Sequence, residues 1–249
     1  MNLNSKLFDV YYFAHDCGQP YQRNAEWLRF FAVVADRIVS DIRPTTVLDA
    51  GCAMGLLIET LRERGVQAFG LDASEYAIQQ AHPAVQPYCR LGSIIEPLPQ
   101  RYDLIACIEV VEHLTQRDAE CAIANLCAYS NDVLFSSTPL DYKEATHFNV
   151  HPPEHWAELF ARHNLFRDVD FDASFITPWA VRFRRSNEPV HRLTRAYERK
   201  FWLLWKENTD LRQRALELRT ENAAILDSDT WRLAKRLQRL RQWLPSRRK

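Results

Sequence analysis

Residues 46–55 read TVLDAGCAMG and indicate the fold more clearly than any other stretch of the sequence. Val47 and Leu48 are typical of a buried strand, and Gly51 and Gly55 mark a tight turn. From Leu56 onward, apolar residues recur at helical spacing. Glycine lets a ligand approach the main chain, and the first turn of a helix offers unpaired N–H groups. The stretch therefore predicts a strand, a turn and a helix that together form a cradle for a polar ligand.

A second predicted strand, residues 68–72, ends in an acidic residue, Asp72. It follows the glycine turn at about the 20-residue distance at which βαβ nucleotide-binding folds place a carboxylate on the ribose hydroxyls. The G-x-G-x-x-G pattern of dinucleotide sites is absent from the turn. Asp72 favours a nucleoside site over the alternative, which is an ordinary turn in an α/β domain.

Residues 49–55 resemble the D-x-G-x-G-x-G loop of the class I S-adenosylmethionine (SAM) methyltransferases, with Ala53 in place of the middle glycine. An alanine is tolerable there if the backbone φ is negative. The resemblance covers roughly residues 25–185 and implies a Rossmann-like α/β fold, with seven strands of which the last is antiparallel. SAM is the implied cofactor. The implied cofactor-binding residues are Asp49, Gly51, Cys52, Gly55, Asp72, Ala73, Ser93, Ile108 and Tyr21; Ser93 stands where many family members carry an acidic residue.

Strand and helix patterns alternate along the chain, as a parallel sheet requires. Strands are predicted near 46–50, 68–72, 87–91, 103–108 and 132–137, and helices near 55–64, 75–81, 117–129 and 153–163. A closing strand pair is predicted at 166–172 and 179–184. The methyltransferase domain is assigned to residues 45–188.

The N-terminal residues 1–44 are rich in aromatic side chains. A helix is predicted over 26–42, ended by Pro44, whereas 11–23 is expected to be a loop. In the methyltransferases that the chain resembles, such a segment often folds over the cofactor as a lid, so Tyr21 and Arg23 are candidate contacts of the cofactor carboxylate. Residues 1–44 are therefore predicted to be an N-terminal helical lid. The alternative is that they only pack against the sheet.

The fourth strand runs into a second motif, residues 109–113, which read EVVEH. Ligands of such sheets bind beyond the carboxyl ends of the strands, where this segment lies. The E-x-x-E-H pattern resembles that of the ubiquinone-biosynthesis O-methyltransferases and of the small-RNA 3′-terminal 2′-O-methyltransferases. Residues 146–155 resemble a later loop of the same relatives, with His147 as the best match to its histidine and His151 as the second.

The resemblance implies that Glu109, Glu112, His113 and His147 face the acceptor. In one mechanism, His113 or His147 is a general base that takes the proton of the acceptor hydroxyl. In the other, all four residues hold a divalent metal ion that acidifies the hydroxyl, and two histidines suit Mn²⁺, Fe²⁺ or Zn²⁺ at least as well as Mg²⁺. A third, purely structural possibility is that Glu112 and His113 cap a helix and hydrogen-bond within the loop.

The sequence changes character after Pro189. A heptad repeat follows, with Phe201, Asn208, Ala215 and Asn222 at one core position and Tyr197, Leu204, Leu211, Leu218 and Ile225 at the other. Leucine at d with asparagine at a is typical of a parallel two-stranded coiled coil. Residues 189–227 therefore predict a homodimer through a coiled coil, or else an amphipathic helix packed on its own catalytic domain.

Residues 228–249 follow a predicted helix break at 227–230 and carry about +8 charges, with no acidic residue after Trp231. Leucines share one face, so the segment predicts a basic amphipathic tail that contacts an anionic membrane or an acidic partner, or else a merely solvated tail. No base-reading module accompanies the charge, so nucleic acid is not an expected partner. The S-x-T-W-R-L run is loosely similar to tails of bacterial surface-polysaccharide enzymes, which suggests a hydroxyl on a lipid-linked glycan as acceptor.

The composition is that of a soluble enzyme. The 249 residues suffice for one large α/β domain with an appendage, and the net charge of zero implies no polyanionic partner. No apolar run could span a bilayer, and Met1–Lys6 lack the apolar core of a signal peptide. The six cysteines form no C-x-x-C pair, which favours a reduced, cytoplasmic protein, peripheral at the inner face of the membrane at most.

Together these features predict a SAM-dependent O-methyltransferase whose acceptor is a small molecule or a sugar of a cell-surface glycan. Within that class, a quinone or phenol acceptor is the alternative. A function of another class also fits, namely a SAM-binding but inactive coiled-coil scaffold of a glycan assembly complex.

Overall fold

A computed structural model describes residues 7–17 and 19–243, with side chains described as far as residue 238. The predictions on Met1–Lys6, on residues 244–249 and on the basic side chains after residue 238 lie outside the described residues. The chain divides into two compact units, 1–188 and 189–249, and each is considered by itself.

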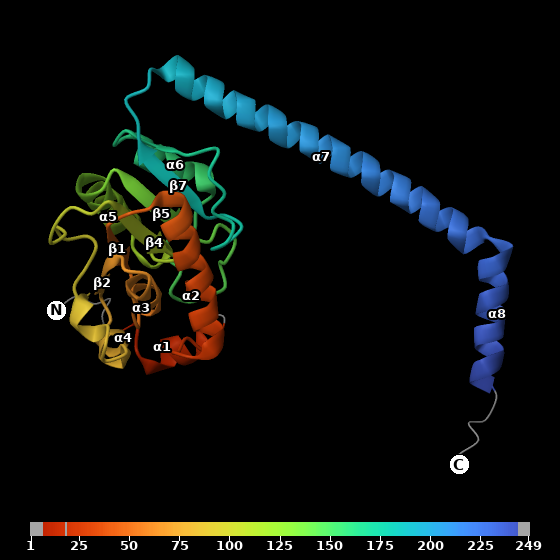
Figure 1. Cartoon of the computed structure of the whole chain (residues 1–249), viewed down its shortest axis with the longest axis horizontal. Helices are drawn as coiled ribbons and strands as arrows, with labels where there is room; N and C mark the ends of the chain where they lie inside the picture. The colour runs from red at the N-terminus through yellow and green to blue at the C-terminus, as the bar shows by residue number, and fades with distance from the viewer. Residues whose placement is uncertain (1–6, 18, 244–249) are drawn as a thin grey trace, which may run out of the picture. The chain divides into compact units, whose positions relative to one another are not determined.

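A seven-stranded sheet in the order β3-β2-β1-β4-β5-β7-β6 forms the centre of the first unit (Figure 1). Strands β1 to β5 pair in parallel, whereas β7 is antiparallel to both of its neighbours. The predicted Rossmann-like sheet with its antiparallel last strand is therefore confirmed. The strands are β1 (Thr46–Ala50), β2 (Gln67–Asp72), β3 (Cys89–Leu91), β4 (Leu104–Ile108), β5 (Asp132–Ser136), β6 (Leu165–Arg167) and β7 (Val181–Arg185).

Helices cover both faces of this sheet. Helices α2 (Ala25–Arg37) and α3 (Leu56–Glu63) pack on one face, and α5 (Gln116–Tyr129) and α6 (Pro153–Ala161) pack on the other. Val47 of β1 lies in the core beside α2 and α3, and its neighbour Leu48 lies in the core beside α5 and α6. Because successive strand residues point to opposite faces, a strand covered on both sides is apolar throughout. The remaining short helices are α4 (Glu75–Gln80), η2 (Ile38–Ile42), η3 (Gln86–Tyr88) and η4 (Val111–His113).

The N-terminal segment differs from the sequence-based expectation, which is a loop over residues 11–23. Asp9 accepts hydrogen bonds from the backbone N–H groups of Tyr11 and Tyr12 at 2.8 and 3.2 Å, and it thereby caps a short helix, α1 (Val10–His15). Phe13 of this helix is buried in a cluster with Met54 of the glycine turn. The loop prediction is wrong because this burial and the Asp9 cap stabilise a helix whose sequence is too short to show a clear period.

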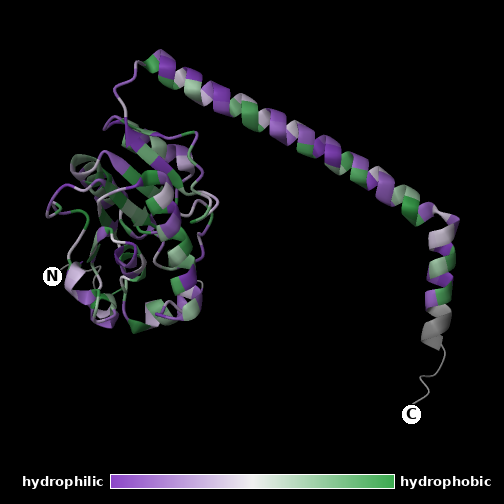
Figure 2. Ribbon diagram, viewed as in Figure 1, coloured by the Kyte–Doolittle hydropathy of each residue, from purple (hydrophilic) through white to green (hydrophobic). Residues whose placement is uncertain are grey.

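The second unit is helical, with α7 (Val190–Asp227) followed by α8 (Asp229–Trp243). Ser228, between them, accepts a hydrogen bond from the backbone N–H of Trp231 at 3.2 Å and caps α8, which confirms the predicted break. Apolar and polar residues are interspersed along α7, and none of its residues is buried (Figure 2).

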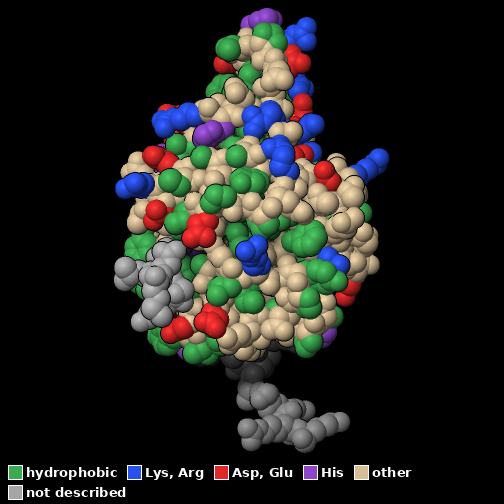
Figure 3. Space-filling view, turned by 90° about the vertical axis from the view of Figure 1, so that its left-hand side faces the viewer, with side chains coloured by type: hydrophobic (Ala, Val, Ile, Leu, Met, Phe, Trp, Pro, Cys, Tyr) green, Lys and Arg blue, Asp and Glu red, His purple; other side chains and the backbone are tan. Residues whose placement is uncertain are grey.

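The surface of the protein carries side chains of mixed character. On the face drawn in Figure 3, acidic, basic and apolar side chains of the described residues are interspersed, in keeping with a net charge of zero. Within the described part of the chain, no helix combines the length and the apolar character needed to cross a membrane.

Candidate active site

The turn after β1 is shaped by three residues in the left-handed region. Gly51, Ala53 and Gly55 have φ angles of 90°, 45° and 72°. A Cβ atom on Gly51 would lie 2.3 Å from a methyl carbon of Val110, so the close approach of this segment requires glycine. Gly55 precedes α3, whose first backbone N–H groups have no partner within the helix. The strand, turn and helix that the sequence predicts are all present.

Ala53 is strained. Alanine is tolerable at this position only if φ is negative, and the φ of Ala53 is positive. We expect Ala53→Gly to raise the free energy of unfolding by roughly 0.5–1 kcal/mol, since relief of the left-handed strain exceeds the entropy that glycine adds to the unfolded chain. Thermal unfolding measures the difference. The control Ala35→Gly, inside α2, should lower stability instead, and an Ala53→Gly midpoint at or below that of the parent chain would contradict the argument.

Asp72 ties the end of β2 to the glycine turn. Its Oδ2 accepts the backbone N–H of Ala53 and its Oδ1 accepts that of Ser74, both at 2.7 Å. Burial raises the pKa of Asp72, while these two N–H groups lower it. The backbone N–H of Ala73 also lowers this pKa, and because a carboxylate has lone pairs for about four hydrogen bonds, Asp72 retains acceptor capacity toward a ribose hydroxyl.

Asp49 is buried at the end of β1, and burial together with the nearby Asp72 raises its pKa to about 7. In the unfolded chain an aspartate ionises near a pH of about 4, so only the folded protein keeps this proton between about pH 4 and pH 7. The stability that Asp49 contributes therefore falls as the pH rises through this interval. The Asp49→Asn side chain cannot ionise. Its free energy of unfolding, measured relative to that of the parent chain, should therefore rise by on the order of 3 kcal/mol between about pH 4 and pH 7.

Urea unfolding of both proteins at about pH 4.5 and pH 8 measures this difference. Equal stability differences at the two pH values would show that Asp49 does not hold its proton in the folded state.

A cleft enclosing about 750 Å³, part of it open to solvent, lies at the carboxyl ends of the central strands. Among the residues predicted to contact the cofactor, Gly51, Asp72, Ala73 and Ser93 lie in its wall. The wall does not include the other described residues of that set, which are Asp49, Cys52, Gly55, Ile108 and Tyr21. Its remaining members are Phe8, Tyr12, Phe13, Ala53, Leu71, Gly92, Ile94, Glu109, Val110, His113 and Leu114.

The contribution of Phe8, Tyr12 and Phe13 to the cleft is not evident from the sequence, which indicates only Tyr21 and Arg23 as contacts in this segment. Their aromatic clustering was the available signal. Phe13 packs on the glycine turn, and Tyr12 and Phe8 lie edge-on to His113 with ring centroids 5.8 and 5.3 Å away. The N-terminal segment therefore closes one side of the cleft.

The second motif begins with a strained residue. Glu109 has a φ of 52°, which is uncommon for a residue other than glycine, and such strain concentrates at ligand sites. Its Oε1 accepts a hydrogen bond from Nε1 of Trp179 at 2.9 Å. Sequence reasoning places Trp179 only at the start of a closing strand, because no local pattern connects residues so far apart in the chain.

His113 is held at both ring nitrogens. Its Nδ1 lies 3.0 Å from Oγ1 and 3.2 Å from the carbonyl oxygen of Thr146, and its Nε2 lies 3.2 Å from the hydroxyl of Tyr12. Thr146 donates its own hydroxyl proton to Glu144, so both Thr146 oxygens act as acceptors toward the ring. Nδ1 therefore carries the proton, and the lone pair of Nε2 accepts the hydroxyl proton of Tyr12. Burial lowers the pKa of His113 to about 4, which keeps the ring neutral.

His147 is positively charged. Its Nε2 lies 2.9 Å from the carboxylate of Glu144, and its Nδ1 donates to the carbonyl oxygen of Asp141 at 2.9 Å. Burial is the largest single influence and lowers the pKa of His147. The hydrogen bonds to Glu144 and Asp141 and the negative charges of Glu144 and Glu112 together outweigh it and bring the pKa to about 9. An imidazolium has no free lone pair, so of the two predicted bases the geometry favours His113.

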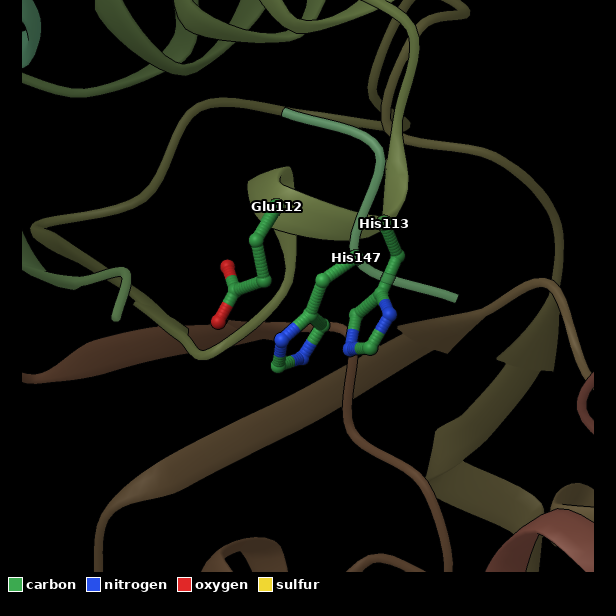
Figure 4. Close-up of side chains that lie close together, drawn as sticks. All are labelled: Glu112, His113 and His147. Carbon is green, nitrogen blue, oxygen red and sulfur yellow. The ribbon is translucent and has the colours of Figure 1, made fainter. Parts of the chain in front are cut away.

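Glu112, His113 and His147 come together as a group whose ligand atoms lie within 4.8 Å of one another, and their side chains project to the same side (Figure 4). Glu112 is fully buried, and its Oε2 has no hydrogen-bond partner among the described residues. Burial and the nearby Glu109 raise the pKa of the Glu112 carboxyl. Glu109, the fourth predicted metal ligand, is not a member of this group within the described residues.

Two further expectations concern the loops around this group. Thr115 caps α5 by accepting the backbone N–H of Asp118 at 3.2 Å, so the interpretation of Glu112 and His113 as helix caps is wrong. His151, the second match to the later histidine, stacks on His155 with ring centroids 3.9 Å apart. Among the described residues it does not join the group around His113.

The sheet order, the glycine turn and the cleft at the strand ends define the class I methyltransferase architecture. A family model described as a methyltransferase domain matches residues 20–168, and the chain belongs to this family of SAM-dependent methyltransferases.

Two curated relatives show the same class. The chain is similar to the ubiquinone biosynthesis O-methyltransferase of Neisseria meningitidis serogroup C, with 32% identity over 123 residues, 45% of this chain and 51% of that protein. The enzyme of the same description from Bradyrhizobium diazoefficiens is 39% identical over 75 residues, 27% of this chain and 29% of that protein. The chain thus spans about half of these relatives or less.

The fold is shared with a solved structure, the magnesium protoporphyrin IX methyltransferase of Synechocystis PCC 6803 with bound SAM. The TM-score is 0.57 at 18% identity, over 75% of this chain and 99% of that chain. At this identity the likeness shows the fold alone.

Proposed function

We propose that this protein transfers a methyl group from SAM to a hydroxyl of its acceptor, with His113 as the general base. The observation that supports this most directly is a hydrogen bond of His113, a residue of the cleft wall, whose Nε2 accepts the hydroxyl proton of Tyr12 at 3.2 Å. An acceptor hydroxyl in the place of the Tyr12 hydroxyl would donate the same hydrogen bond, which is the contact that general-base catalysis needs.

The residues of the cleft fit SAM. The glycine turn lets a ligand approach the main chain, and Asp72 has free acceptor capacity for ribose hydroxyls. SAM supplies a methyl group already activated by a positively charged sulfur, so the protein's task is alignment and exclusion of water. We assign the exclusion of water to the lid formed by the N-terminal segment, through Phe8, Tyr12 and Phe13.

The proton of the acceptor hydroxyl would pass to Nε2 of His113. Thr146 fixes the tautomer by accepting from Nδ1–H, and it also fixes the orientation of the ring. The carboxylate of Glu144 lies 3.9 Å from Nδ1 and hydrogen-bonds to Thr146, so it stabilises the charge that His113 gains. A base, a group that orients it and a nearby carboxylate, here His113, Thr146 and Glu144, also occur together in other sites that activate a hydroxyl.

We expect methyl transfer to survive exhaustive chelation. A histidine binds a metal through a ring lone pair, and both nitrogens of His147 instead act as donors to Glu144 and Asp141. The measurement is transfer of labelled methyl after treatment with EDTA, with and without added Mn²⁺ or Zn²⁺. If chelation abolishes turnover and added metal restores it, the metal mechanism is correct and the base mechanism is wrong.

Two classes of hydroxyl acceptor have separate support. A phenol or quinol is favoured by the relatives described as ubiquinone biosynthesis O-methyltransferases and by the phenol of Tyr12 that already lies against His113. A sugar of a cell-surface glycan is supported by the C-terminal run that resembles tails of surface-polysaccharide enzymes.

Incubation with labelled SAM and a cell-envelope extract, followed by separation of lipid-soluble phenols from glycans, tests the function and the acceptor together. Label in either fraction, absent with His113→Asn, supports the proposal. Binding of SAM without label in any fraction would favour the inactive scaffold.

A further inference from the structure

Helix α7 carries an apolar stripe that is open to solvent. None of its residues is buried in the chain. Phe201, Leu204, Leu211, Leu218 and Ile225 are 69%, 53%, 63%, 44% and 56% exposed. They fall at a and d positions of one heptad register, so they line a single seam along the helix. A seam of this length marks a contact surface, because soluble proteins seldom leave large apolar patches in water.

We propose that α7 pairs with α7 of a second copy of this chain as a parallel two-stranded coiled coil. The seam is interrupted by Asn208 and Asn222, both at a positions. In a parallel pair in register, each asparagine lies opposite its own counterpart, and the two amides can hydrogen-bond to each other.

Other partners of the seam satisfy these asparagines less well. In an antiparallel pair the a positions face d positions, so Asn208 and Asn222 would lie against leucine or isoleucine side chains. An apolar domain surface or the acyl region of a membrane would likewise leave the amides without partners, at a cost of roughly 1–3 kcal/mol each. A second copy in register is the occupant that pairs both of them.

The charges that flank the seam are compatible with this arrangement. Glu207 at g and Arg212 at the following e position have opposite charges, and g-to-e′ pairs across a parallel coiled coil bring such residues together. Arg214 at g and Arg219 at e have the same charge. Arg214, however, is already paired within its own helix with Glu217 at 3.1 Å, which reduces the repulsion.

Sedimentation equilibrium of the intact chain tests the proposal, with an expected mass twice that of the 29.2 kDa chain. The double variant Leu211→Glu with Leu218→Glu puts charges at two d positions and should be a monomer. The matched control, Gln213→Glu with Thr220→Glu, puts the same charges on the outer f positions and should remain a dimer. SAM binding, measured on each variant, reports whether the catalytic unit is folded. A monomeric, trimeric or tetrameric parent chain overturns the proposal, and so does a dimeric Leu211→Glu, Leu218→Glu variant.

Cross-linking tests the orientation. Asn208→Cys should form a disulfide-linked dimer on mild oxidation, because the two residues face each other only in a parallel pair in register. The parent chain, in which Cys121 is exposed, gives the background, and Gln213→Cys at an outer position should not exceed it. A dimer that Asn208→Cys cannot cross-link overturns the parallel arrangement. If the parent chain is a monomer that floats with anionic vesicles, and the Leu211→Glu, Leu218→Glu variant no longer does so, the seam binds lipid instead.

Discussion

Asp72→Asn is expected to weaken the binding of SAM by a factor of about a hundred or more. The carboxylate is the acceptor that we assign to the ribose hydroxyls, and a hydrogen bond to a charged group contributes roughly 1.5–3 kcal/mol. Each 1.4 kcal/mol changes a binding constant about tenfold. The substitution also loosens the glycine turn, because Oδ2 of Asp72 accepts the N–H of Ala53 at 2.7 Å. Isothermal titration with SAM and with its demethylated product measures the loss.

Asp103→Asn is the matched control for this experiment. Oδ2 of Asp103 accepts the backbone N–H groups of Thr45 and Thr46 at 3.0 and 2.9 Å, at the amino end of the sheet and away from the cleft. It should therefore alter stability and leave SAM affinity unchanged. Normal SAM affinity in Asp72→Asn, or an equal loss of affinity in Asp103→Asn, would show that Asp72 does not bind the ribose.

His113→Asn is expected to lower kcat by about 10²–10⁴-fold, the usual contribution of a general base, while SAM affinity is retained. Asparagine can still donate a hydrogen bond toward Thr146, but it cannot take a proton at neutral pH. His147→Gln should have a smaller effect, because the charged ring of His147 offers no lone pair. Single-turnover assays with labelled SAM separate the chemical step from cofactor binding.

Two further variants make this test specific. His163→Asn, outside the cleft wall, should leave kcat unchanged. Tyr12→Phe removes only the hydroxyl that hydrogen-bonds to Nε2, and because the acceptor supplies its own hydroxyl, methyl transfer should persist. Full turnover by His113→Asn, or its abolition by Tyr12→Phe alone, would show that His113 is not the base.

The strand and helix assignments follow from short-range patterns. The apolar runs of β1, β4 and β5 mark strands covered on both faces, and Gly51 and Gly55 mark the turn. These signals lie within a few residues of each other, which is why they can be interpreted from one sequence. The helix α1 shows no such signal, because it depends on Asp9 and on the burial of Phe13 against Met54.

Local motifs are enough to predict the family, the order of the strands and main helices, and the acidic and histidine side chains that meet at the strand ends. The protonation state of each group, in contrast, depends on the folded arrangement. The pairing of His147 with Glu144 makes it a cation, while the contacts of His113 with Thr146 and Tyr12 leave a lone pair on Nε2. These properties depend on partners brought together by folding and on their removal from water, and no spacing within one segment encodes them.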